Sequence, residues 1–258
     1  MHIVAALRLA PDLSGEVELN ADGSDLDREW LDMKLNEFDD QALEEAVSLK
    51  ENFGARVTAV GLDVEGMDRA LQTALARGAD QAFKVVFTED ADASSRSTAP
   101  LYAEVARELG ADLFLTGVQA PEDVFGQLAP FVAARLGWPM ANAARAVRPE
   151  KDCVYVEQEH SGGAAVSLRL ATPAAIGVQT ASRPIRYVAG SKLRQFSGTK
   201  IDSLNVSANI NDPKAVRGAL RPPARSASIE MLGDDPETVA TRLQALLAER
   251  GLLKATNP

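Results

Sequence analysis

The sequence predicts an α/β protein with a doubly wound, mostly parallel sheet, an added antiparallel meander and an extended C-terminal arm. Short apolar runs alternate with amphipathic helical stretches up to Gly137, and most of the helical stretches end on a glycine. The alternation stops after Trp138 and Pro139. Strands that alternate with helices form parallel sheets covered by helices on both faces, and their crossovers are right-handed.

The first half of the chain supplies this alternation. The run 3–9 is nearly continuous and apolar, which is typical of a strand buried on both faces. Asn36 is a good N-cap, and Gly54 and Gly78 are expected C-cap glycines. A turn is expected at 20–23. The predicted strands are 3–9, 57–60, 82–86 and 113–115, and the predicted helices are 36–52, 67–77, 100–109 (capped from Ser94–Ser97) and 126–136.

The second half of the chain follows a different pattern. Three short runs of period two, 154–159, 165–170 and 174–179, predict the antiparallel meander. Residues 181–235 are rich in proline and show little periodicity, and 236–250 forms an amphipathic helix. We expect an α/β domain over 1–195 and an arm over 196–258 that buries its apolar face on another chain.

The stretch 112–139 organises the rest of the sequence. A buried strand ends at Gly117, a polar loop follows, and a helix begins near Gly126. The unpaired N–H groups and the dipole of a helix N-terminus attract anions, and ligands of open α/β sheets lie beyond the carboxyl ends of the strands. This spacing predicts either a phosphate site or an ordinary strand-to-helix connection.

Composition excludes several classes of function. The chain has 258 residues and a formal net charge of -10, which argues against binding to nucleic acid or an anionic membrane through bulk charge. The single cysteine, Cys153, excludes an internal disulfide. No apolar run reaches the ~20 residues that cross a bilayer. The N-terminus has the pattern of a strand and not of a signal peptide, so we expect a cytoplasmic location, or an organelle matrix after processing.

No catalytic constellation is visible in the sequence. His2 and His160 lie far apart, and no metal-ligand spacing or nucleophile–base set occurs. Neither a dinucleotide fingerprint nor a P-loop is present. The acidic pair Glu44–Glu45 is expected on a solvated helix face. The pattern favours a carrier or a binding module over an enzyme.

Several segments together resemble the beta subunit of electron-transfer flavoprotein, over roughly residues 1–195. Residues 36–40 and 117–119 look more like the branch of methylotrophic bacteria, whose partners oxidise methylated amines. The segments that carry the resemblance are LNEFDDQALEEAVSLKE (35–51), RALQTALARGADQA (69–82), GVQAPEDVFGQLAPFVAARLGWP (117–139), SGGAAVSLRLATPAAIGVQ (161–179) and Arg186–Tyr187.

The resemblance implies an electron carrier with an adenine-nucleotide alpha-hydrolase-like fold. Its partner would be an alpha subunit that holds most of the FAD, and the beta subunit would bury a structural AMP. Electrons would come from flavin-dependent dehydrogenases and pass to a quinone oxidoreductase.

The resemblance also implies a set of site residues. The adenine, ribose and phosphate of AMP would lie along strand ends and the 117–128 loop, and Phe38 would lie beside the flavin ring. The cofactor residues would be Ala6, Asn36, Glu37, Phe38, Asp39, Val60, Gly117, Gln119, Asp123, Gly126, Gln127 and Leu128. The docking residues for the dehydrogenase would be Arg186, Tyr187, Val188, Lys192 and Leu193.

Two departures from the family pattern leave alternatives open. Leu128 stands where the family often has threonine, and the loop lacks the usual run of aspartates. A bifurcating flavoprotein with a second FAD in the AMP site is one alternative. A nucleotide-binding regulator of the universal-stress type is another. The docking loop also lacks the usual exposed leucine after Arg186–Tyr187, so Val188 or Leu193 would serve as its apolar anchor.

Overall fold

A computed structural model describes residues 1–12, 14, 18–27, 31–86, 94–121, 123–208 and 229–253. Residues Met1–Ala219 form one compact unit and Leu220–Pro258 form a second. The helices are α1 (Glu37–Phe53), α2 (Met67–Arg77), α3 (Ser95–Glu108), α4 (Leu128–Leu136), α5 (Gly190–Phe196) and α6 (Pro236–Glu249). The strands are β1 (His2–Leu7), β2 (Leu9–Pro11), β3 (Met33–Leu35), β4 (Arg56–Leu62), β5 (Gln81–Val85), β6 (Leu113–Gly117), β7 (Met140–Pro149), β8 (Cys153–Glu159), β9 (Ala165–Ala171), β10 (Ala174–Val178) and β11 (Asp202–Leu204).

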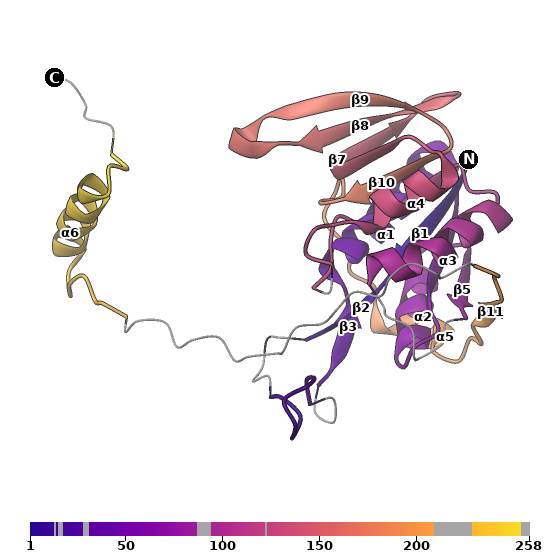
Figure 1. Ribbon diagram of the computed structural model, residues 1–258, viewed down its shortest axis with the longest axis horizontal. Coiled ribbons are helices and arrows are strands. Elements are labelled where there is room, and N and C mark those ends of the chain that lie inside the picture. Colours follow the sequence, from indigo (N-terminus) through magenta and orange to yellow (C-terminus); the bar gives the residue numbers. More distant parts are fainter. Residues whose placement is uncertain are drawn as a thin grey trace. The chain divides into compact units, whose positions relative to one another are not determined.

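The first unit is built on a nine-stranded sheet in the order β11-β5-β4-β1-β6-β10-β7-β8-β9. All neighbours from β11 to β7 pair in parallel, and β7, β8 and β9 pair antiparallel (Figure 1). A separate antiparallel pair, β2 and β3, leaves the end of β1. The predicted α/β class with a mostly parallel sheet is confirmed.

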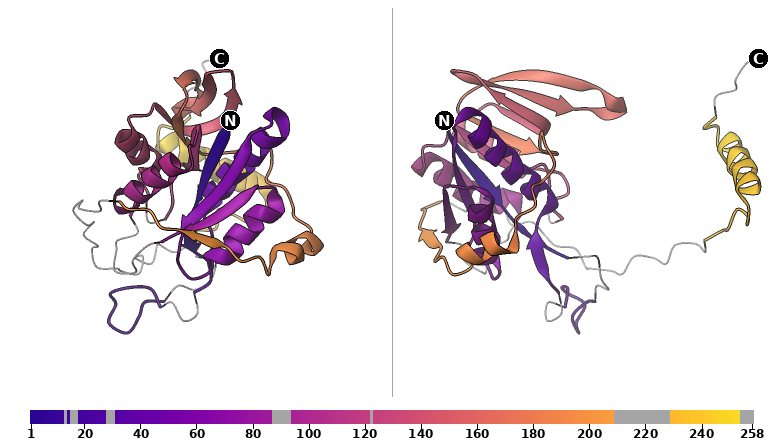
Figure 2. Two further views of the ribbon diagram at one scale, coloured as in Figure 1. Left: turned by 90° about the vertical axis from the view of Figure 1, so that its right-hand side faces the viewer. Right: turned by 180° about the vertical axis from the view of Figure 1, so that it is seen from behind.

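Helices cover both faces of the sheet (Figure 2). Alternate residues of β1 point to opposite faces, as a strand requires. Ile3, Ala5 and Leu7 pack with α1 and α2, whereas Val4 and Ala6 pack with α3 and α4. This explains why β1 is apolar without interruption, since both of its faces are covered.

Local signals placed most helix ends correctly, although α3 begins at Ser95 and not at 100 as predicted. Gly54 ends α1 in the left-handed conformation and Gly78 follows α2, as glycine caps do. Ser94 accepts a hydrogen bond from the backbone N–H of Ser97 at the start of α3. The expected turn at 20–23 also occurs, with Gly23 donating to the Asn20 carbonyl.

The prediction of the meander was wrong in one strand. Residues 174–178 form β10, which lies in parallel between β6 and β7 and is buried throughout. A fully buried strand needs apolar residues on both faces, and its sequence AAIGV meets that need without alternation. The meander consists instead of β7, β8 and β9, and β7 was not predicted.

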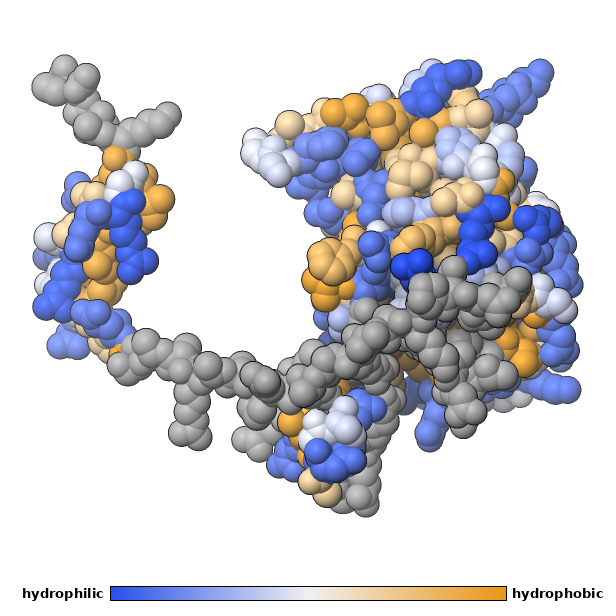
Figure 3. Space-filling model, in the orientation of Figure 1, coloured by the Kyte–Doolittle hydropathy of each residue, from blue (hydrophilic) through white to orange (hydrophobic). Residues whose placement is uncertain are grey.

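Two further elements were not predicted. The short helix α5 packs beside α2, and β11 adds to the sheet at β5, inside the segment 196–258 that we expected to be an arm. In the second unit, α6 has a capping Asp235 and a proline at its start. Figure 3 shows an apolar stripe along α6 beside charged residues, and no residue of α6 is buried.

Candidate functional site

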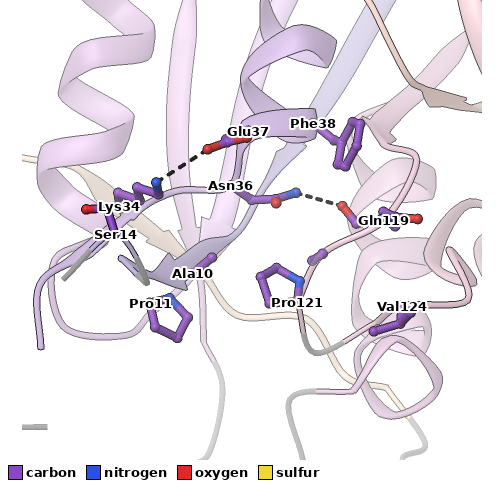
Figure 4. Close-up of a pocket in the computed structure, with 11 residues that line it drawn as sticks. Ala10, Pro11, Ser14, Lys34, Asn36, Glu37, Phe38, Gln119, Pro121 and Val124 are labelled. Atoms are coloured by element: carbon purple, nitrogen blue, oxygen red, sulfur yellow. Dashed lines mark hydrogen bonds and ion pairs between the residues drawn. The ribbon is translucent and has the colours of Figure 1, made fainter. Parts of the chain in front are cut away.

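A pocket of about 390 Å³ opens beside the carboxyl ends of β1 and β6 (Figure 4). This volume lies in the range of small-molecule sites, and the location is where open α/β sheets bind ligands. Its walls come from the β2–β3 pair, the start of α1 and the loop after β6. The lining residues are Ala10, Pro11, Ser14, Lys34, Asn36, Glu37, Phe38, Gln119, Ala120, Pro121 and Val124.

The start of α1 forms one wall of the pocket. Asn36 occupies the cap position, but its side chain makes no capping bond and donates to the Gln119 carbonyl oxygen at 2.9 Å. Figure 4 shows this bond bridging the helix start and the loop, with Phe38 on the same wall. Asn36 therefore fixes the distance between the two walls rather than capping the helix.

The rim next to the helix start carries a cluster of charged side chains. The Lys34 ammonium lies 3.3 Å from both the Asp12 and Glu37 carboxylates. Hydrogen bonds to Asp12 and then to Glu37 raise the pKa of Lys34, so the side chain stays protonated at neutral pH.

A buried carboxylate holds the helix start onto the sheet. Asp39 is fully buried and accepts hydrogen bonds from the Arg8 backbone N–H at 3.0 Å and from the Arg8 guanidinium at 2.9 Å. It also accepts from the Gly117 N–H at 2.6 Å and the Thr116 hydroxyl at 3.3 Å. These bonds join the ends of β1 and β6 to the first turn of α1. We call Arg8, Asp39 and Gly117 the strand-end clamp.

Glycine is required at position 117 because the helix approaches so closely. A Cβ on Gly117 would lie 2.5 Å from the backbone N of Asp39 and from the backbone carbonyl carbon of Phe38. Any side chain there would force α1 away from the sheet. This contact brings Phe38 to the pocket.

The loop after β6 is closed by its own aspartate. The Asp123 carboxylate accepts from the Gln127 backbone N–H at 2.9 and 3.1 Å and from the Ser95 hydroxyl at 2.5 Å. It also lies 3.7 Å from the Arg8 guanidinium. Asp123 is 6% exposed. The predicted anion position at the start of α4 therefore already has a carboxylate at its first N–H.

Gly126 makes the turn into α4. Its φ is +65°, and a Cβ there would collide with the Val118 carbonyl oxygen. The Asn142 side chain donates to the Gly126 carbonyl at 3.1 Å, which ties the loop to β7.

The residues expected at a nucleotide site fall into three groups. Asn36, Glu37, Phe38 and Gln119 line the pocket. Asp39, Gly117, Asp123, Gly126 and Gln127 make the contacts beneath it that are described above. The remaining residues, Ala6, Val60 and Leu128, are at most 1% exposed and belong to the apolar core between the sheet and α3–α4.

Sequence reasoning missed Arg8 and Ser95. A charged residue directly after a continuous apolar strand is the signal that could have found Arg8, since such a residue needs a partner when the strand end is buried. The partner was visible as an aspartate in the first turn of the next helix. The contact of Ser95 with the loop had no local signal, because the two are far apart in sequence.

The expectation that Glu44 and Glu45 are solvated was wrong. Both are at most 1% exposed, because residues 181–186 cover this face of α1. Glu44 pairs with Arg183 at 2.7 Å and Arg186 at 3.0 Å, and Glu45 accepts from the backbone N–H groups of Val147 and Ser182.

The expected docking residues differ in how they are held. Arg186 donates to Glu44 and Glu51, so its guanidinium anchors the segment onto α1. Tyr187 is 90% exposed and Leu193 is 36% exposed. Lys192 is also exposed, and Val188 is half-buried. The segment thus presents an aromatic and an apolar side chain from a firmly anchored base.

Two features of the described residues bear on other functions. None of their His, Cys, Asp and Glu side chains gather in groups of three or more that could hold a metal ion. Within the same part of the chain, every helix is too short or too polar to cross a membrane.

Comparisons with known proteins agree with one another. Residues 25–202 match the family model for the electron transfer flavoprotein domain. The chain is 28% identical to an electron transfer flavoprotein subunit beta of Dictyostelium discoideum, over 96% of this chain and 99% of that protein. It is 30% identical to the subunit beta of Syntrophomonas wolfei, over 94% of each chain, and 26% identical to that of Methylophilus methylotrophus, over 86% of each.

Proposed function

Because the chain belongs to the electron transfer flavoprotein family and aligns with its beta subunits over nearly its whole length, we propose that it forms the flavin-facing half of a heterodimer with an alpha-type subunit. Members of this family are electron carriers and not enzymes. The chain accordingly has the role of a beta subunit in electron transfer.

The observation that carries the proposal is the pocket beside Phe38. It has an aromatic side chain on one wall and is lined by Val124, which is 68% exposed; the next residue in the chain, Phe125, is 87% exposed. Large apolar side chains exposed next to a pocket are typical of a surface that a partner covers. We infer that the alpha subunit closes this rim.

The pocket fits part of a flavin held mainly by the partner. Phe38 offers an aromatic face or edge to a flat ring, and Lys34, paired with Glu37, places a hydrogen-bond donor at the rim. FAD, when bound, would take up and pass on the electrons. The strand-end clamp and the Asn36–Gln119 bond would hold Phe38 and the loop in position against the ring. The residues at the start of α4 do not fit AMP, because the Asp123 carboxylate already accepts the Gln127 N–H there.

We also propose an electron donor and an electron acceptor for the heterodimer. The exposed Tyr187 and Leu193, with the neighbouring Lys192, would dock a flavin-dependent dehydrogenase. The resemblance of residues 36–40 and 117–119 to the methylotroph branch makes a methylated-amine dehydrogenase the donor that we propose. A quinone oxidoreductase would be the acceptor, and the heterodimer would work in the cytoplasm.

The second unit would contribute to binding of the alpha subunit and not to the stability of the first unit. None of α6 is buried, and in its stripe Leu243 is exposed while Val239, Leu246 and Leu247 are only half-buried. An amphipathic helix gains stability by burying such a stripe. We therefore assign the stripe to the alpha subunit, as expected for a C-terminal arm.

Co-expression with the alpha-type subunit tests the proposal. We expect a yellow one-to-one heterodimer, and Leu246→Asp should weaken it by placing a charge in the buried stripe. Gln244→Asp is the matched control, because Gln244 is exposed outside that stripe. A colourless chain that does not bind the alpha-type subunit would overturn the proposed function.

A further inference from the structure

The start of α4 is where a nucleotide phosphate is expected, and its donors are few. Gln127 donates its N–H to both oxygens of the Asp123 carboxylate. Pro130, in the first turn of α4, has no N–H at all. This leaves Leu128 and Ala129 as the N–H groups of the first turn, fewer than a helix N-terminus ordinarily presents.

The side chains at this position also disfavour a phosphate. Leu128 is 1% exposed and packs in the core, and its side chain has no hydroxyl that could donate to an anion. A phosphate beside the Asp123 carboxylate would bring two negative charges together where little water can screen them. Like charges in such a site disfavour each other's ionised form.

Asp123 itself has the surroundings that a bound anion would have. Its carboxylate sits at a helix N-terminus, accepts the Ser95 hydroxyl and faces the guanidinium of Arg8 at 3.7 Å. Arg8 is shared with Asp39, so the same guanidinium joins this carboxylate to the strand-end clamp. The side chain does structurally what a buried phosphate would do.

We propose that Asp123 fills the anion position at the start of α4, so that this chain holds no adenine nucleotide phosphate there. The inference concerns the second ligand of the proposed heterodimer and is independent of the flavin pocket near Phe38. It equally excludes the diphosphate of a second FAD from this position.

The test measures released ligands and thermal stability. The heterodimer is denatured and its ligands are identified by mass spectrometry, and we expect FAD without AMP, at one FAD per heterodimer. The melting temperature of the full chain should not rise when AMP is added. Stoichiometric AMP, a second FAD or a rise in melting temperature with AMP would overturn the proposal.

Removing the carboxylate gives the converse test. Asp123→Ala vacates the position beside Arg8 and Ser95, and we expect its melting temperature to rise with AMP or inorganic phosphate. A soluble variant that gains no response would overturn the assignment of this position as a filled anion site. Asp123→Asn, which keeps the size of the side chain, is the second variant if Asp123→Ala fails to fold.

A matched control distinguishes a specific anion site from the general attraction of anions to a helix N-terminus. Asp235 caps α6 through the Thr238 N–H and is exposed. Asp235→Ala should gain no response to either anion, and an equal gain would overturn the proposal. The FAD content reports separately on the proposed function: AMP found together with FAD contradicts only the inference about Asp123. A heterodimer that lacks FAD contradicts the proposed function, while the response of the chain alone still decides the inference.

Discussion

Asp39→Ala tests the strand-end clamp, on which the geometry of the pocket depends. The substitution removes the carboxylate that accepts from Arg8 and from the Gly117 N–H. The Arg8 guanidinium is 8% exposed and would lose its closest carboxylate. The backbone N–H groups of Arg8 and Gly117 would also lose their acceptor in the interior.

The magnitude follows from burial. Removing one partner of a buried ion pair costs about 3–5 kcal/mol. A domain has a total stability of about 5–15 kcal/mol, so the loss takes a large part of it. With a urea m-value of about 3 kcal/mol/M, the unfolding midpoint should fall by about 1–1.7 M.

The assay is urea unfolding of the chain, followed by far-UV circular dichroism. Glu37→Ala is the matched control, since Glu37 lies in the same helical turn but its side chain is 82% exposed. Its midpoint should stay within the error of the measurement. If Asp39→Ala shifted the midpoint no more than Glu37→Ala, the clamp would not hold the helix start and the reasoning would be refuted.

Three further predictions follow from other residues. Gly126→Ala should lower the melting temperature more than Gly137→Ala. Both glycines have φ near +65°, but only at Gly126 does a carbonyl oxygen lie where the Cβ would go. Equal losses of melting temperature would contradict this close contact. Burial, with the nearby Arg56, lowers the pKa of His2, so the unfolded state binds the proton more readily and stability should fall as pH drops below about 6.5. Chemical unfolding at about pH 7.5 and about pH 5.5 should show that acidification lowers the free energy of unfolding less in His2→Gln than in the wild type. An equal loss in both proteins would show that His2 does not cause the pH dependence. Lys192→Glu should slow electron uptake from the dehydrogenase without loss of FAD or of melting temperature. Arg186→Glu should instead lower the melting temperature, because it removes one of the two arginines that pair with buried Glu44 and brings a second carboxylate beside it. Stopped-flow and thermal unfolding check both, and unchanged uptake at low salt would rule out docking at Lys192.

Local sequence signals predicted the parallel half of the fold. Glycine caps such as Gly54 and Gly78 and the alternation of strand and helix depend on neighbours within a few residues. The position of β10 in the sheet is not decided by its neighbours in sequence, because strand order depends on contacts between residues far apart in the chain. The run at 174–178 is apolar on both faces, which was the one available signal that it lies inside a sheet rather than at an edge.

The candidate site was predicted in part for a similar reason. Asn36, Phe38 and Gln119 were expected together and do line one pocket. The burial of Glu44 depends on a segment some 140 residues later, which no local pattern reveals. Asp123 was expected to meet a ligand, but the contact with Ser95 arises only when α3 packs beside the loop. The loop and helix-start residues of the pocket could be located from local patterns, but contacts between segments far apart in the chain could not.

The spectrum of the flavin in the heterodimer tests the central claim that the flavin lies at the pocket beside Phe38. Phe38→Leu changes the aromatic wall, and Phe53→Leu, at the other end of α1 and 52% exposed, is the control. We expect Phe38→Leu to alter the visible absorption and fluorescence of bound FAD, and Phe53→Leu to leave both unchanged. Identical spectra for wild type and Phe38→Leu, with FAD fully retained, would contradict the account.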